Sequence, residues 1–123
     1  MGGKWGQLYF LVFYFEKEAI RLLMEEIKSK KTPDELKQVF EEVIAKLVKA
    51  DQLLARVSLF DAKNTSIQNP KFQKIVEFQI KKAEEELAKA EKELEKGRPD
   101  KAIMRLGKAW LHSQLAIKFA NKN

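Results

Sequence analysis

The side chains best suited to chemistry in this 123-residue chain are Arg105 and His112. Seven positions separate them, so on an α-helix they lie two turns apart on one face. An arginine can hold a phosphate while a histidine moves a proton, which is the acid–base chemistry of phosphodiester cleavage. The alternative interpretation is a half-exposed helix histidine without a catalytic role.

Basic side chains recur every three or four residues around this pair. They are Arg98, Lys101, Arg105, Lys108 and His112. With a net charge of +6, such a stripe can bind nucleic acid or another polyanion. It can equally be a solvated face, because basic residues stabilise helix C-termini and the preceding segment is rich in glutamate.

The composition excludes several kinds of site. The chain has no cysteine and one histidine, which excludes disulfides, thiolate zinc sites and iron–sulfur clusters. It has no Glu-x-x-His pair of the di-iron bundles and no glycine-rich phosphate loop. We therefore expect neither a metal nor a cofactor. The abundant lysine and glutamate resemble the composition of thermophile proteins.

The sequence contains two clear signals for the start of a helix. Thr32 precedes Pro33 and stands three residues before Glu35, which predicts a threonine N-cap closed by a capping box. Asn69 and Pro70 repeat the order of a polar cap followed by proline, after a polar loop. Helices are therefore expected to begin at Pro33 and Pro70.

The remaining boundaries come from Gly97, a helix-ending residue, and from Pro99 with Asp100, which begin another helix. The predicted helices span about residues 5–30, 33–61, 70–96 and 99–121. Similar lengths joined by short turns predict an all-α antiparallel up-down-up-down four-helix bundle, a single domain over residues 1–123.

Apolar residues at intervals of three and four predict the core faces. The segment 70–96 offers Val76, Ile80, Ala83, Leu87, Ala90 and Leu94. The segment 99–121 offers Ile103, Leu106, Trp110, Ser113, Ile117 and Ala120. The segment 33–61 offers Leu36, Phe40, Val43, Leu47, Ala50, Leu54 and Val57, with extra apolar residues at Val39, Ile44, Val48 and Phe60.

Residues 8–15 form an unbroken apolar run that by itself fits either a helix or a buried strand. Helical spacing continues downstream without a turn, which favours one helix. Its expected core residues are Trp5, Leu8, Val12, Ala19, Ile20, Leu23 and Ile27. Phe10, Leu11, Tyr14 and Leu22 then point elsewhere and are the predicted interface, most simply with a second copy.

The same run is too short to cross a bilayer, because eight helical residues span only about 12 Å. As a signal peptide, residues 4–15 lack a small-residue cleavage site, since Glu16 follows directly. We expect a cytoplasmic protein. A secreted one is the alternative if residues 4–15 are the remnant of a signal.

Parts of the chain resemble known helical families. From about Ala50 to Ala120 the pattern is similar to helical-bundle modules of archaeal and bacterial multidomain proteins. Gly97, Ala102, Leu106 and Ala109 resemble the second helix of a tetratricopeptide repeat, although no second copy follows at the 34-residue period. The Arg105–His112 spacing resembles the HEPN family, some of whose members are ribonucleases.

These patterns predict a non-enzymatic bundle that acts through protein contacts and self-associates. The expected partner is a second copy of the chain, forming a homodimer, or another protein. The alternative is a nucleic-acid-binding module that uses the basic stripe, and a HEPN-like ribonuclease is a third hypothesis.

Overall fold

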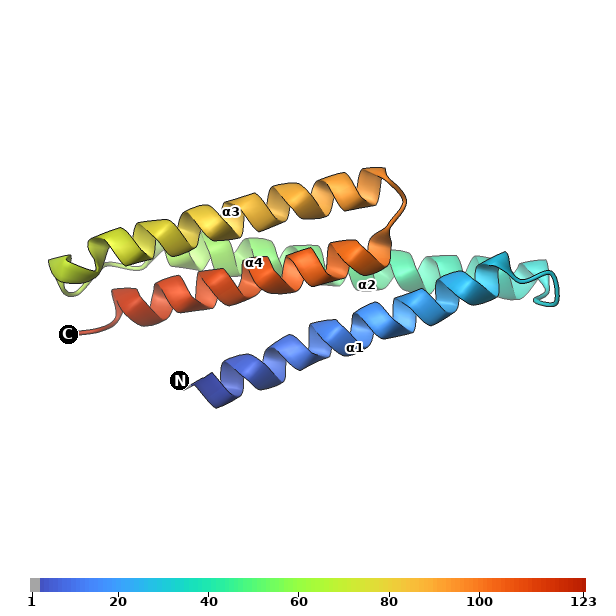
Figure 1. Cartoon of the computed structure of the whole chain (residues 1–123), viewed down its shortest axis with the longest axis horizontal. Coiled ribbons are helices and arrows are strands. Elements are labelled where there is room, and N and C mark those ends of the chain that lie inside the picture. The colour runs from blue at the N-terminus through green and yellow to red at the C-terminus, as the bar shows by residue number, and fades with distance from the viewer. Residues whose placement is uncertain (1–2) are drawn as a thin grey trace.

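The computed structural model describes residues 3–123, with side chains described from residue 8 onward. Its helices are α1 (Gly3–Lys28), α2 (Asp34–Asn64), α3 (Gln73–Glu95) and α4 (Pro99–Ala120), and a short 3₁₀ turn, η1 (Pro70–Phe72), leads into α3. Successive helices run in opposite directions (Figure 1), which confirms the all-α four-helix prediction. The apolar run 8–15 is helix, not strand. Across residues 3–123, none of the helices combines the length and apolarity that crossing a membrane requires.

Helix α4 is the centre of the arrangement. It packs most extensively against α3 and also contacts α2 and α1, whereas α2 and α3 barely meet (Figure 1). In a square four-helix bundle, α2 and α4 lie on opposite corners. Here α4 instead packs against all three other helices, which leaves large surfaces of α1 and α2 uncovered.

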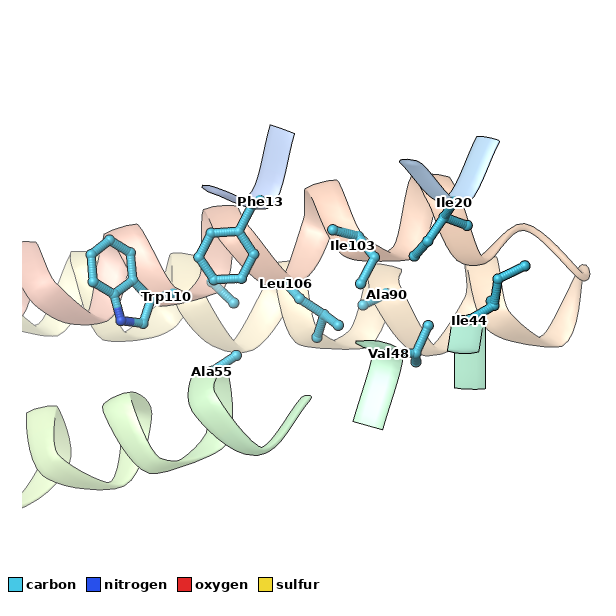
Figure 2. Close-up of a cluster of buried hydrophobic side chains, with 10 residues drawn as sticks. Phe13, Ile20, Ile44, Val48, Ala55, Ala90, Ile103, Leu106 and Trp110 are labelled. Atoms are coloured by element: carbon cyan, nitrogen blue, oxygen red, sulfur yellow. The ribbon is translucent and has the colours of Figure 1, made fainter. Parts of the chain in front are cut away.

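The main core forms where side chains of all four helices converge on α4 (Figure 2). Ile103 and Leu106 of α4 are fully buried and meet Ile20 of α1, Ala90 of α3 and Val48 of α2. A smaller cluster closes the end of the bundle where α3 begins and α4 ends. It contains Ala62, Val76, Ala116 and Ala120.

Two of the helix boundaries form as predicted. Gly97 has a φ of +71°, and its N–H donates to the Leu94 carbonyl at 3.0 Å as α3 ends. The Asn69 side chain accepts from the Lys71 N–H at 3.1 Å, with Pro70 in the first turn.

The predicted cap at Thr32 is wrong. Helix α2 begins at Asp34, and no side chain caps it at Pro33. The Thr32 hydroxyl instead donates to Glu26 Oε2 at 3.0 Å. The turn between α1 and α2 directs this hydroxyl back toward α1, away from the free N–H groups of α2.

The predicted core faces of α3 and α4 are confirmed, since every member is buried or half-buried. The prediction for α2 is only partly right: Ile44 and Val48 are buried as expected, but most of the expected face is exposed. The buried residues of α2 are Ile44, Val48, Asp51, Ala55, Ser58, Leu59 and Ala62. Several of these are small, which lets α2 approach α4 closely, and Leu36, Val43, Leu54 and Val57 remain exposed.

The predicted core face of α1 is also partly wrong. Phe13 and Ile20 are buried, whereas Leu8, Val12 and Ala19 are exposed. The side chain of Trp5, also expected on this face, lies outside the described side chains. The helix is rotated because Phe13 packs against Gly107, a position on α4 that has no side chain to obstruct it.

Candidate functional site

The basic stripe of α4 lies beside α3, and α3 supplies partners for three of its five members. Arg105 Nη1 is 3.2 Å from Glu86 Oε2, and Arg98 Nη1 is 3.8 Å from Glu93 Oε2. His112 Nδ1 is 2.7 Å from Gln79 Oε1. These contacts bind α4 to α3. Arg98, Lys101 and Lys108 are exposed, and of these Lys101 and Lys108 have no ion-pair partner on α3 within the described residues.

His112 is half-buried, and its surroundings disfavour the charged imidazolium. Desolvation lowers its pKa below the ordinary 6.5, although the negative charge of Glu86 opposes this effect. The imidazole is therefore neutral at neutral pH. Arg105 and His112 share a face of α4 as predicted, each held by an α3 side chain. Ribonuclease activity stays a prediction, which RNA cleavage abolished in His112→Ala would support.

Nucleic-acid binding also stays a prediction. Because Arg98, Arg105 and His112 have partners on α3, a polyanion on this face would contact Lys101 and Lys108 first. Titration with duplex and single-stranded oligonucleotides tests this hypothesis. Binding that falls steeply with salt and is lost in Lys101→Glu/Lys108→Glu would support it.

Most of the exposed large hydrophobic residues in the described part of the chain lie on α1 and α2. The exposed large hydrophobic residues of α1 are Leu8, Tyr9, Leu11, Val12, Tyr14, Phe15 and Leu22. Those of α2 are Leu36, Val39, Val43, Leu53, Leu54, Val57 and Phe60. We refer to these residues together as the outer surface. Single exposed apolar residues are ordinary on a protein, whereas a concentration of them on two neighbouring helices is typical of an interface.

The four residues predicted as an interface lie partly on this surface. Leu11, Tyr14 and Leu22 are exposed, and Phe10 is half-buried. Leu22 continues a row on α1 at intervals of four and three residues, formed by Leu8, Val12, Phe15, Ala19 and Leu22.

Helix α2 carries the longer row. It consists of Leu36, Val39, Val43, Ala50, Leu53, Val57 and Phe60, all exposed, and we name it the outer stripe. Its members follow a heptad pattern, in which Lys46 takes the one polar position. Helix α2 therefore has two heptad faces, and the more apolar one points outward.

A pocket of about 300 Å³ lies between α1 and α2, next to the outer surface. Its lining is apolar except for Glu16 and comprises Tyr9, Val12, Phe13, Glu16, Leu54 and Trp110. Trp110 belongs to α4, and its ring centroid is 5.5 Å from that of Tyr9. The pocket thus lies where α1 and α2 separate above the central helix.

Asp51 of α2 is buried next to Glu16, with 5% of its surface exposed. Its Oδ2 atom receives no hydrogen bond. Burial, together with hydrogen bonding to Glu16 and repulsion from its charge, raises the pKa of Asp51 to about 8. Asp51 is therefore protonated at neutral pH, and its carboxyl O–H can donate a hydrogen bond to the Glu16 carboxylate.

Sequence reasoning missed Asp51, Glu16 and the outward direction of the outer stripe. Asp51 does continue the spacing of Ile44, Val48 and Ala55, which is the signal that would have found it. That signal is weak because an aspartate between apolar positions usually marks a solvent-facing residue.

Comparison with known proteins adds no relative from which a role can be transferred: no family model, no curated protein and no solved structure matches this chain.

Proposed function

We propose that this protein is a non-enzymatic helical module that acts through protein contacts and associates with a second copy of itself. The observation that carries the proposal is the outer surface of α1 and α2. Leu53, Phe15 and Phe60 each expose more than 60% of their surface there.

Leaving this surface in water is costly. Burial of a large apolar side chain stabilises by roughly 1.5 to 3 kcal/mol, and many such side chains lie together on the two helices. Helix α4, by contrast, is absent from the set of exposed large hydrophobic residues within the described part of the chain. The asymmetry favours a partner on the α1–α2 side of the molecule.

A second copy is the simplest partner, because a two-fold dimer buries the same surface on both chains and closes the assembly. The distribution of contacts within the chain also supports a partner at the outer surface. Three members of the basic stripe are engaged with α3, whereas the apolar side chains of the outer surface have no cover within residues 3–123.

Sedimentation equilibrium over a range of micromolar concentrations tests the proposal. We expect association of the 14.3 kDa chain that increases with concentration. Leu22→Glu/Leu53→Glu changes one residue on each helix of the outer surface and should weaken association at least about tenfold.

Ile75→Glu/Phe78→Glu is the matched control, because both residues are exposed large hydrophobics on α3, outside the outer surface. This variant should associate like the unmodified protein. A chain that stays monomeric throughout the concentration range would overturn the proposal.

A further inference from the structure

We infer that two copies of this chain dock through an antiparallel pairing of their α2 helices along the outer stripe. This inference rests on the proposed self-association and specifies its interface. Helix α2 is the longest of the described helices, and all the residues of its outer stripe are exposed.

The outer stripe has the pattern of a coiled-coil seam. From Leu36 to Phe60 the spacing alternates between three and four residues through eight positions, of which seven are apolar. A heptad pattern maintained over more than three heptads is typical of helices that pair side by side. At 1.5 Å per residue, this seam is about 36 Å long.

The polar position selects the alignment. Lys46 must lie opposite a small residue, because a large side chain there would bury its ammonium group away from water. In an antiparallel pair centred between Lys46 and Ala50, each Lys46 faces the partner's Ala50. The other layers are then apolar throughout: Leu36 with the partner's Phe60, Val39 with the partner's Val57, and Val43 with the partner's Leu53.

Charges beside the stripe fit the same alignment. One flank carries, at intervals of seven residues, Glu35, Glu42, Lys49, Arg56 and Lys63, all of them exposed. The flank is acidic in the first half of α2 and basic in the second. An antiparallel pair therefore brings Glu35 to the partner's Lys63 and Glu42 to the partner's Arg56, and two-fold symmetry doubles both contacts.

The basic side chains of this flank already form ion pairs within the chain, but these pairs are weak enough to be exchanged for contacts with the partner. Arg56 pairs with Glu91 of α3 at 2.8 Å, and Lys63 pairs with Glu84 at 3.2 Å. Both pairs are exposed, and exposed ion pairs contribute little to stability. The opposite flank carries, at the same interval, Phe40, Leu47, Leu54 and Asp61. The antiparallel pair brings the partner's Phe40 to Leu54, which lines the pocket.

Two charge-reversed variants test the pairing. Variant A is Glu35→Lys/Glu42→Lys, and variant B is Arg56→Glu/Lys63→Glu. Each variant alone sets like charges opposite one another at four contacts, so each should self-associate on the order of tenfold more weakly or worse. Mixing A with B restores four opposite-charge contacts, and the mixed dimer should form within about threefold of the unmodified affinity.

Rescue on mixing separates this interface from simple loss of folding, because a destabilised chain is not repaired by another destabilised chain. A control variant with the same charge change on α3, Glu84→Lys/Glu91→Lys, should show no such rescue with B. Dimers that form normally in A and in B overturn the α2 pairing and leave self-association standing. Absence of any association in the unmodified chain overturns both.

Spin labels measure the direction of the pairing, and the chain has no cysteine to compete for them. Labels at Lys49→Cys lie across the two-fold axis, so they should be less than about 20 Å apart. Labels at Lys63→Cys should be more than about 40 Å apart, because 28 helical residues separate the paired positions. Short distances at both sites indicate a parallel pair and overturn the proposal.

Discussion

Phe13 of α1 lies directly against Gly107 of α4, where an added Cβ would be 2.8 Å from Phe13 Cγ and 2.9 Å from Phe13 Cβ. Real Cβ atoms do not approach a neighbour so closely. The absent side chain at Gly107 therefore sets how closely α1 packs on the central helix.

Gly107→Ala should destabilise the protein by about 1 to 3 kcal/mol, because Phe13 and α1 must move to admit the methyl group. In a Phe13→Ala background the same substitution should be neutral or stabilise by up to about 1 kcal/mol, since alanine is the better helix former. Urea denaturation of the four proteins measures both effects. Equal effects in the two backgrounds would show that Phe13 is not the obstacle.

Asp51 should make the protein less stable as the pH rises. Its pKa in the folded state is about 8, above the ordinary 3.8, so the folded protein holds this proton more tightly than the unfolded chain does. The stabilisation is complete below pH 3.8 and is lost as the pH rises through about 8.

Asp51→Asn removes this titration and should be more stable than the parent by about 1 kcal/mol or more at pH 9, with a smaller difference at pH 5. Thermal melts between these pH values measure the crossover. Asp61→Asn, an exposed change on the same helix, is the control and should follow the parent. Parallel profiles for the parent and Asp51→Asn would contradict the burial of a protonated Asp51.

His112 is the only histidine in the sequence, so its imidazole signals can be followed by NMR without overlap from another histidine. Its titration midpoint should lie below 6.5, because desolvation lowers the pKa. The pKa is lower in the folded state, so the contribution to stability is present above 6.5 and is lost as the pH falls through the folded-state value. Glu86→Gln removes an opposing charge and should lower the midpoint further. A midpoint that rises in this variant would contradict the assigned cause.

Two aspartate substitutions distinguish the inner faces of the bundle from the outer stripe. Val76→Asp places a charge at a side chain that is 2% exposed, and it should cost several kcal/mol against a typical total of about 5 to 15. Val57→Asp, at 48% exposure, should change the stability of the monomer by less than about 1 kcal/mol. Chemical denaturation at concentrations that dissociate any dimer compares them. Similar losses would show that the outer stripe is buried within the chain.

The accuracy of the sequence predictions depends on how many apolar faces each helix has. Helix α3 has one such face, bounded by glutamate and lysine, and Val76 and Ala83 are buried as predicted. Helix α2 has two faces, and hydrophobicity selects the one with Leu54 and Val57, both exposed, whereas the core uses the smaller Ala55. Apolar content alone cannot tell a face that meets α4 from one that meets another protein.

The candidate site was less predictable than the fold for a related reason. The spacing of Arg105 and His112 follows from one helix, and it was read correctly. Contact between Glu16 and Asp51 joins two helices, and it depends on the rotation that Phe13 imposes on α1. No local pattern carries that information.

The central position of α4 has a consequence for synthesis on the ribosome. Residues 99–120 are translated after the three helices that pack around them, so α1, α2 and α3 leave the exit tunnel before α4, the helix that joins them. The nascent α1–α2 hairpin then displays both of its apolar sides at once, one destined for α4 and one outward. During this interval the chain is most exposed to aggregation and to chaperone binding, and the emergence of α4 ends it.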